Sequence, residues 1–460
     1  MKRVVLLCLA FAVAVVAQQP SPPRPPAASP APPAATTTAA TTTDAATTPA
    51  EPEMPSQPGR YIGVGSCVNS GCHGGTEPLD TTGVLQNEYF TWLNNDQHSK
   101  AYNILLSDRS ARIARNMRLK KAANEEAVCL DCHTTNVPRN LIVKALDRED
   151  GVQCEMCHGP AGGWFAEHTE EGWTHEQSLQ RGMLDLRSIN ARASTCAGCH
   201  IGNAKKEVDH ELIAAGHPIL AFELDNYTES MPPHWALRYE GGRDTHGVRA
   251  WAVGQVVSFR ESMDNLARHA RGNEWPEFSE MSCFNCHHDL KNSEWRQERG
   301  WPDRAGLPTW SPQRWAVLRL ILERVSPGVR GELDPLVAQI ARGVARMNDP
   351  AGVASSADRA RAIVAPLVAR VDAARWTDSD VRALMTTITN DREVIYDVQT
   401  AEQAALALQS LASVRTRRDP KLLRGGMTKS IDALFEELRS RDDYEPSRFS
   451  AKLAAVRGAI

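Results

Sequence analysis

Five similar cysteine–histidine motifs constrain what this chain can fold into more than any other feature. Four have the pattern Cys-x-x-Cys-His, and the first along the chain is stretched by two residues. In this pattern both thiols bond to the vinyl groups of a haem, and the histidine becomes the proximal ligand of the iron. The motifs predict five covalent haems c, held by Cys67, Cys72 and His73; Cys129, Cys132 and His133; Cys154, Cys157 and His158; Cys196, Cys199 and His200; Cys283, Cys286 and His287.

Other uses of paired cysteines fit this chain less well. Zinc sites combine Cys-x-x-Cys elements in pairs, whereas here the number of pairs is odd and a histidine follows each one directly. A thioredoxin-type redox site would need one such pair in a βαβ setting. Of the 11 cysteines, Cys8 falls in the N-terminal segment and the other ten all belong to the motifs. No cysteine is left over for a disulfide or a nucleophile.

The N-terminus predicts export. Met1-Lys2-Arg3 precedes an apolar run that ends in small residues at Ala17, which is typical of a cleaved secretory signal over residues 1–17. The run is shorter than the ~20 residues that span a bilayer, so we expect no transmembrane segment in the mature chain and a periplasmic or otherwise exported location. Lipidation at Cys8 is the alternative. Residues 18–59 are rich in Pro, Ala and Thr and predict a disordered linker, either a glycosylated tether or a plain spacer.

Residues 60–305 hold all five motifs and all 14 histidines. So little chain for each large ring predicts a multihaem cytochrome c domain of short helices and long loops, with one longer helix over residues 246–271. This part carries 26 basic and 34 acidic residues, and haem propionates would add further negative charge. We therefore expect redox partner proteins with a basic docking surface, and nothing indicates a nucleic-acid partner.

Residues 306–460 contain neither Cys nor His and have the apolar periodicity of helices. Stripes run through residues 333–344 and 431–438, and Thr400 with Gln403 predicts the start of a helix. We expect an all-α bundle of about six helices, so the fold class is mainly α throughout. The bundle is either a docking or dimerisation module or a cover for one side of the haem domain.

The second axial ligand of each iron decides between an electron carrier and an enzyme. Histidine or methionine at this position closes the iron, whereas an open position permits chemistry. Nine histidines lie outside the motifs and favour mostly bis-histidine haems. The predicted distal ligands are His98, His168, His210, His217 and His234, with His175, His246 and His288 in reserve.

Three segments carry a resemblance to a known family. GVQCEMCHGP at residues 151–160, FAEH at residues 165–168 and QHSKA at residues 97–101 resemble segments of multihaem c-type cytochromes, in particular the tetrahaem cytochrome that accepts electrons from hydroxylamine oxidoreductase. IAAGHP at residues 213–218 and WPEF at residues 275–278 are similar to larger multihaem cytochromes. The resemblance covers roughly residues 60–300.

The resemblance implies that His98 and His168 are distal ligands. It also implies a five-coordinate iron at the second motif, Cys129–His133. The fifth motif, the stretched first motif and residues 306–460 depart from the tetrahaem pattern. The resulting hypothesis is an exported pentahaem cytochrome that carries electrons between periplasmic redox partners. The alternative is an oxidoreductase that acts on a small nitrogen or sulfur oxyspecies at one five-coordinate haem, so whether the chain is an enzyme stays open.

Overall fold

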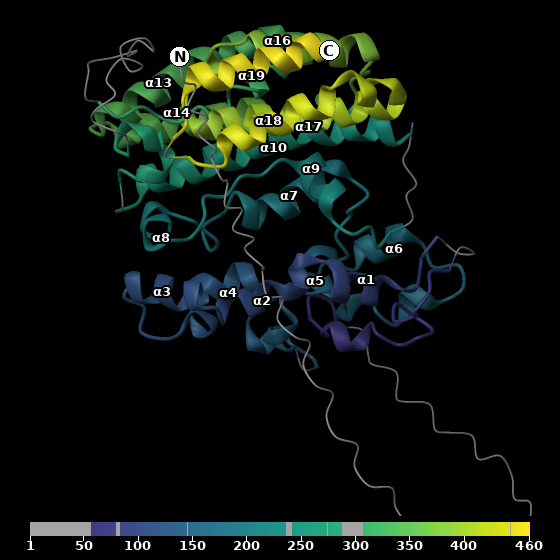
Figure 1. Cartoon of the computed structure of the whole chain (residues 1–460). Helices are drawn as coiled ribbons and strands as arrows, with labels where there is room; N and C mark the ends of the chain where they lie inside the picture. Colours follow the sequence, from purple (N-terminus) through teal and green to yellow (C-terminus); the bar gives the residue numbers. More distant parts are fainter. Residues whose placement is uncertain are drawn as a thin grey trace, which may run out of the picture. The chain divides into compact units, whose positions relative to one another are not determined.

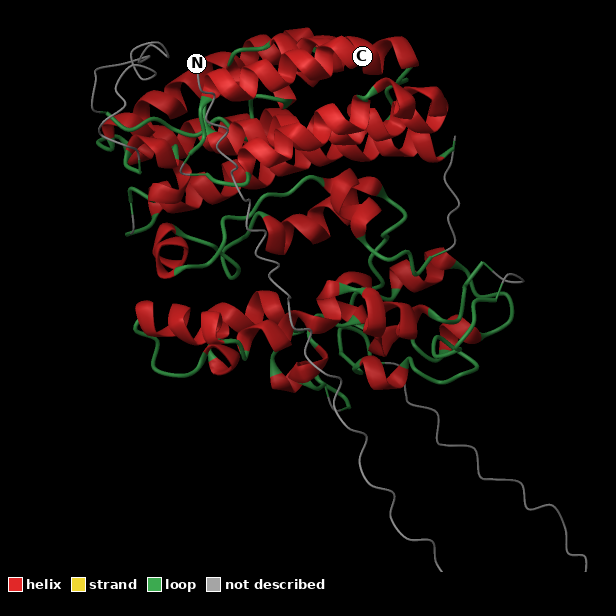
Figure 2. Cartoon of the chain, in the orientation of Figure 1, coloured by secondary structure: helices red, strands yellow, loops and turns green. Residues whose placement is uncertain are grey.

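The computed structural model describes residues 57–79, 83–144, 146–235, 242–273, 275–287, 307–441 and 443–460. Helices account for the regular structure of these residues, which contain no strand, as Figure 2 shows. The prediction of a mainly α fold is confirmed. No helix in the described ranges is long and apolar enough to cross a membrane. The predicted signal segment, nearly all of the predicted linker and His288 lie outside the described residues.

Short helices carry the second, third and fourth motifs and surround the first, as expected for a chain with so many loops. They are α1 (Glu88–Asn95), α2 (Ala101–Leu105), α3 (Asp108–Asn116), α4 (Ala127–His133), α5 (Cys154–His158), α6 (His175–Gln180), α7 (Ile189–His200), α8 (His210–Ala215) and α9 (Leu224–Ser230). Side-chain caps start several of them: Ser107, Ser188 and Asp209 accept backbone N–H groups at the first turns of α3, α7 and α8.

Longer helices follow. They are α10 (Arg243–Arg271), α12 (Leu318–Val325), α13 (Pro327–Arg346), α14 (Pro350–Val364), α15 (Leu367–Asp372), α16 (Asp378–Asn390), α17 (Val398–Arg418), α18 (Met427–Leu438) and α19 (Pro446–Ala459). Figure 1 shows α10 lying between the short helices and the rest of this group. Pro327, Pro350 and Pro446 each stand at the first helical residue, where the missing N–H costs nothing.

Two details of the predicted bundle need correction. Eight helices, α12 to α19, lie in the described part of residues 307–460, rather than about six. Helix α17 starts before Thr400: Asp397 is its N-cap and accepts the Thr400 N–H at 2.7 Å. Asp397 is fully buried and also accepts the Ser311 hydroxyl at 3.0 Å, so tertiary contacts fix the helix start ahead of the local capping pattern.

The helix expected over residues 246–271 is α10, and it is central to the fold. Every residue from Ala250 to Phe259 is buried, which is typical of a helix inside a core. It packs against α7 and α9 on the motif side and against α14, α15 and α17 on the other. Phe259 lies 5.4 Å from Trp315, measured between ring centroids.

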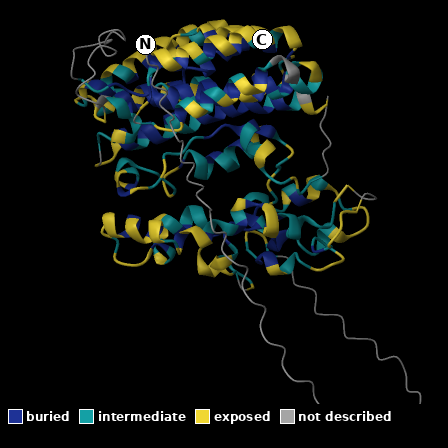
Figure 3. Cartoon of the chain, viewed as in Figure 1, coloured by how far each residue is buried: buried dark blue, intermediate teal, exposed yellow. Residues whose placement is uncertain are grey.

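One hydrophobic core therefore extends from Ile189 to Val456. It crosses the boundary that the sequence predicts at residue 306, and residues 54–460 form one compact unit. That boundary marks the end of the Cys- and His-rich composition, but it does not separate two packed cores. Earlier in the chain, up to residue 188, buried apolar residues form only small clusters, such as Ile62 with Ala161 and Trp164. Figure 3 shows this contrast in burial between the two ends of the unit.

The continuous core can be tested with the pair Phe259 and Trp315, one on each side of the predicted boundary. Phe259→Ala should lower the free energy of unfolding by about 3–5 kcal/mol, because a fully buried aromatic ring is replaced by a cavity. Urea titration followed by circular dichroism at 222 nm measures this. The exposed control Arg342→Ala should stay within about 0.5 kcal/mol. Unfolding of residues 307–460 that is insensitive to Phe259→Ala would contradict a shared core.

Candidate haem-binding sites

We number the candidate sites one to five in the chain order of their motifs. In sites two, three and four the motif ends a helix, so α4, α5 and α7 finish at His133, His158 and His200. A helix places residues three apart on the same face, so both cysteines of each motif lie on one side, with the histidine in the next turn. Site five uses a 3₁₀ turn instead, Cys283–Asn285, and the His287 N–H donates to the Cys283 carbonyl at 2.9 Å.

The stretched motif of site one reaches the same closure by a different route. The His73 N–H donates to the Cys67 carbonyl at 3.2 Å, although two more residues lie between them than in the ordinary pattern. Asn69 organises the additional residues: its carbonyl accepts the Cys72 N–H at 2.8 Å, and its side chain accepts the Gly71 N–H at 2.9 Å. The insertion is therefore looped out while the end of the motif is held as in site five.

Each motif histidine faces one of the five histidines predicted as distal ligands. The distances between ring centroids are 6.3 Å for His73 and His168, 6.4 Å for His133 and His217, 6.4 Å for His158 and His234, 6.2 Å for His200 and His98, and 6.4 Å for His287 and His210. Sequence reasoning left open which distal histidine serves which motif, and this arrangement supplies a pairing.

These distances fit a metal ion between two imidazoles. Two metal–nitrogen bonds of about 2.0 Å, plus about 1 Å from each nitrogen to its ring centre, span roughly 6 Å. The five observed distances differ by only 0.2 Å, although the partners come from unrelated elements. Direct packing of rings allows a wide range of separations, so the narrow spread favours a common spacer. The residues present therefore fit haem iron at all five sites.

Hydrogen bonds at Nδ1 hold several of these rings with Nε2 directed elsewhere. The Nδ1 atoms of His73 and His98 lie 3.0 Å and 2.9 Å from the carboxylates of Glu88 and Asp96. In three more rings the Nδ1 atom bonds to a backbone carbonyl. His133 bonds to the carbonyl of Ala101 at 3.0 Å, His217 to that of Pro218 at 2.8 Å, and His168 to that of Phe165. Acceptors that bond to Nδ1 in this way fix the tautomer of a histidine ligand and leave Nε2 for the metal.

The electrostatic surroundings of the rings differ between sites. Burial lowers the pKa of His158 and of His200 to about 4, so both imidazoles are neutral, which is the form that binds a metal. The hydrogen bond to Glu88 raises the pKa of His73, and the hydrogen bond to Asp96 raises that of His98. A carboxylate acceptor also makes a bound imidazole a stronger electron donor.

The reserve histidines have other surroundings. The Nε2 atom of His175 lies 3.1 Å from Asp185, so the atom that would bind a metal already has a partner. His246 lies on α10, where burial lowers its pKa to about 4. Each motif histidine already faces one of the five histidines predicted as distal ligands.

Neighbouring sites touch through their attachment segments. The Cys67 and Cys154 thiols are close enough that Cys154 lowers the pKa of Cys67, which places sites one and three next to each other. The sulfur atoms of Cys132 and Cys199 join sites two and four in the same way. The Lys206 ammonium lies 3.2 Å from Cys199 Sγ and 3.7 Å from Met156 Sδ, so it bridges sites four and three.

Helix α8 connects the remaining pair of sites. His210 is its first residue and faces the motif histidine of site five, whereas His217 follows its left-handed cap Gly216 and faces that of site two. The contacts thus run through the sites in the order one, three, four, two, five. Glu277 Oε1 accepts the His210 N–H at 2.9 Å and ties the start of α8 to the segment before the fifth motif.

Sequence reasoning missed the acidic side chains that position the rings. Asp96 stands two residues before His98, so its hydrogen bond had a local signal, whereas Glu88 and His73 come from separate segments. It also missed a buried cluster at site five. His269 on α10 contacts Glu207, which precedes α8, and its Nδ1 lies 3.0 Å from Glu280, which precedes the fifth motif.

The His269 cluster makes stability depend on pH. Burial lowers the pKa of His269, but the hydrogen bonds to Glu207 and Glu280 outweigh it and raise the pKa to about 9. A raised folded-state pKa gives stability that is complete below the unfolded value and is lost as the pH rises towards 9. Between pH 6.5 and 9.5 the loss should be about 2–3 kcal/mol, measured by urea unfolding. His269→Gln should remove this part of the pH dependence, and parallel curves for both proteins would contradict it.

Comparison with known proteins agrees with the motif geometry. The family model of cytochrome c554 and c-prime matches residues 69–159, a range that includes the second and third motifs and His98. Searches of curated proteins and of solved structures each found no match. The expected resemblance to multihaem c-type cytochromes is confirmed over this range. Over residues 69–159 the chain is therefore similar to the cytochrome c554 and c-prime family.

Proposed function

We propose that the chain is an exported pentahaem c-type cytochrome that carries electrons between redox proteins, and that two histidines ligate each iron. The similarity of residues 69–159 to the cytochrome c554 and c-prime family supports haem-mediated electron transfer in general terms. The observation that carries the finer proposal is the set of five imidazole pairs with centroids 6.2–6.4 Å apart. The ten motif cysteines would supply the thioethers.

Bound haem supplies reversible one-electron chemistry of iron. The chain's own contribution is to hold ten imidazoles in fixed positions. Acceptors such as Asp96 for His98 and the Ala101 carbonyl for His133 prevent the rings from turning away. Two histidines on every iron leave no position for a substrate, so the pairing favours an electron carrier over an oxidoreductase.

The ligation of site two distinguishes an electron carrier from an oxidoreductase. The resemblance implies a five-coordinate iron there, but His217 faces His133 at 6.4 Å, in the same geometry as the other four pairs. His217 is held by its Nδ1 bond to the Pro218 carbonyl and by its position directly after α8. Proline fixes the backbone next to the imidazole. We therefore assign His217 as the distal ligand of site two in this chain.

The order in which the sites contact one another suits an electron carrier. Sites one, three, four, two and five follow one another without a gap, through the cysteine contacts, Lys206 and α8. Electron transfer between proteins needs a continuous row of this kind with accessible ends. An enzyme that reacts a substrate at a single iron would not need every site to touch a neighbour.

The expected partner with a basic docking surface fits one end of this row. Glu170, Glu171 and Glu176 are exposed in and near α6, close in sequence to His168 of site one. They are not part of any ion pair among the described residues. Opposite charges on a partner would steer it to this end and would do so less effectively at high salt.

Five attached haems can be counted directly. After export with haem maturation, the intact mass of the protein should exceed that of its mature polypeptide by five haem masses, because all ten motif cysteines form thioethers. Cys67→Ala with Cys72→Ala should lower the count to four covalent haems. A wild-type count of four would show that the stretched motif stays empty, and absence of haem would overturn the proposal.

The ligation of site two gives a second test. His217→Ala should convert one low-spin haem to high-spin, because the iron loses its second nitrogen, and electron paramagnetic resonance detects this change. The matched control is His175→Ala, since His175 pairs with Asp185 and faces no motif histidine. A high-spin signal already present in the wild type and unaltered by His217→Ala would instead support the five-coordinate alternative.

A further inference from the structure

The segment around α3 carries a charge opposite to that expected for the haem-bearing part of the chain. Between residues 109 and 121 it has six cations and no acidic residue, although the whole chain has 52 basic and 56 acidic residues. All six cations are exposed: Arg109, Arg112, Arg115, Arg118, Lys120 and Lys121. We call this set the α3 basic surface.

Helical geometry gathers these charges on one side. Arg109, Arg112 and Arg115 are three residues apart and share one face of α3, whereas Ile113 and Ala114 are buried on the other. Like charges at this spacing destabilise a helix by a few tenths of a kcal/mol per pair, so helix stability does not explain the pattern.

Several other arginines of the chain are neutralised by neighbouring carboxylates, but these are not. Arg249 pairs with Asp372, Arg268 with Glu207 and Arg361 with Asp264. Within the described ranges no ion pair involves the α3 basic surface. Its positive field is therefore directed to solvent, where it can act on an approaching molecule.

The α3 basic surface borders site two. The Arg109 guanidinium donates to the Gly216 carbonyl at 2.8 Å and 3.2 Å, directly before His217. Asn116 donates to the Ala215 carbonyl at 2.9 Å, and Ile113 packs against Leu212 and Ala215 of α8. Helix α3 thus supports the short helix that presents both His210 and His217.

We propose that the α3 basic surface is the docking site for a second redox partner, a protein with an acidic surface, which exchanges electrons with this chain at site two. The inference rests on the proposed function. Charge complementarity identifies the occupant: six cations without an ion pair suit a partner rich in carboxylates, and their position beside His217 suits electron exchange at site two.

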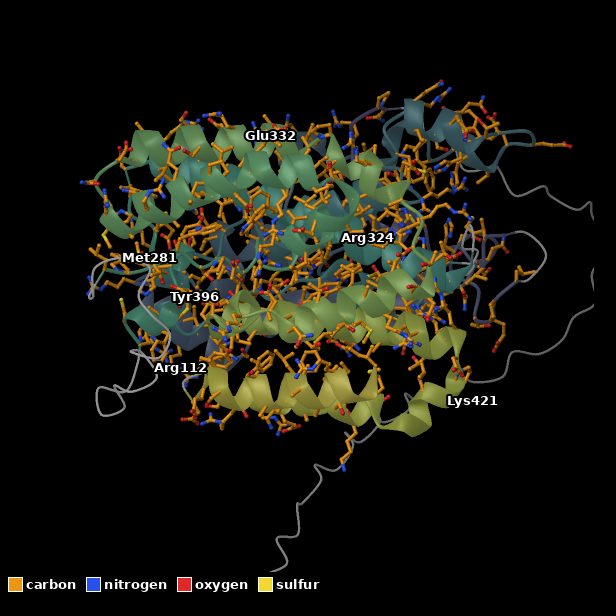
Figure 4. The ribbon with its side chains drawn as sticks, turned by 90° about the horizontal axis from the view of Figure 1, so that it is seen from above. Arg112, Met281, Arg324, Glu332, Tyr396 and Lys421 are labelled. Atoms are coloured by element: carbon orange, nitrogen blue, oxygen red, sulfur yellow. The ribbon has the colours of Figure 1, made fainter. Side chains whose placement is uncertain are left out.

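The two charged surfaces lie at different ends of the row of short helices. In Figure 1, α3 is at one end of this row and α6 at the other, with α4, α2, α5 and α1 between them. Arg112 lies towards the left margin in the view from above, on the side where Figure 1 shows α3 (Figure 4). Opposite charges at opposite ends would let one partner dock at each end without competing.

The test uses two electron-transfer probes of opposite charge. Flavodoxin hydroquinone, an acidic donor, gives one electron to a ferric haem of this protein and becomes the semiquinone, without transfer of a proton. A small basic cytochrome c takes one electron from the reduced protein. Stopped-flow rates at low salt are compared for the wild type and for Arg112→Gln/Arg115→Gln/Arg118→Gln, which spares Arg109 because it holds Gly216.

The triple variant should react with flavodoxin about tenfold more slowly at low salt and at the wild-type rate at high salt. Its reaction with the basic cytochrome c should not slow. Glu170→Gln/Glu171→Gln/Glu176→Gln should show the reverse pattern. The control Arg342→Gln/Arg346→Gln/Arg359→Gln removes the same charge from exposed positions of α13 and α14 and should leave both rates unchanged.

Cross-linking gives a readout that does not depend on electron transfer. A carbodiimide joins lysine to carboxylate only in contact, so cross-linked peptides between flavodoxin and this chain should contain Lys120 or Lys121. Cross-links confined to other lysines, or an equal loss of rate in the control variant, would overturn the inference. Binding of anionic phospholipid vesicles that needs the three arginines, while flavodoxin reacts normally, would assign the surface to a membrane and also overturn it.

The same measurements distinguish failure of the docking site from failure of the proposed function. If the wild type exchanges electrons with neither probe, electron carriage itself is wrong. If it exchanges with both and the α3 variants behave as the control does, only the docking site is wrong.

Discussion

The pairing of imidazoles across the chain is the constraint on which the first half of the structure depends. Up to residue 188 the buried apolar side chains form only small clusters, too few to define a single arrangement of loops. Each pair joins a motif to a segment more than 70 residues away, for example His158 to His234 and His200 to His98. A metal bonded to both rings closes a long loop, which removes conformational freedom from the unfolded chain as other cross-links do.

The second half depends on ordinary packing, with α10 shared between the halves. Trp251, Phe259 and Met263 are fully buried because α7 and α9 cover one side of the helix and α14 and α17 the other. The region without cysteine and histidine is thus continuous with the candidate haem sites through a common core. Its apolar surface supports α7, which ends in the fourth motif.

Local chemistry was predictable from the sequence and long-range geometry was not. Both cysteines and the proximal histidine of each motif lie within seven residues, so spacing alone indicates them. The resemblance predicts His98 and His168 as distal ligands, but no local signal in the sequence places His217 opposite His133. The core continues across the predicted boundary at residue 306, because the boundary was placed where cysteine and histidine end and packing depends on apolar helix faces. The unbroken apolar run AWAV at residues 250–253 was the available sign that α10 is covered on both sides.

Helix α8 has a mechanical consequence. It is only six residues long, its N-cap and C-cap are both formed, and it presents His210 at one end and His217 just beyond the other. Because a capped helix transmits displacement along its axis with little deformation, the imidazoles of sites two and five cannot move independently. With irons bound at both sites, displacement of one imidazole would strain the position of the other. Sites two and five are therefore linked by the short rigid helix α8 as well as by proximity, so a displacement of the imidazole at one site also affects the other.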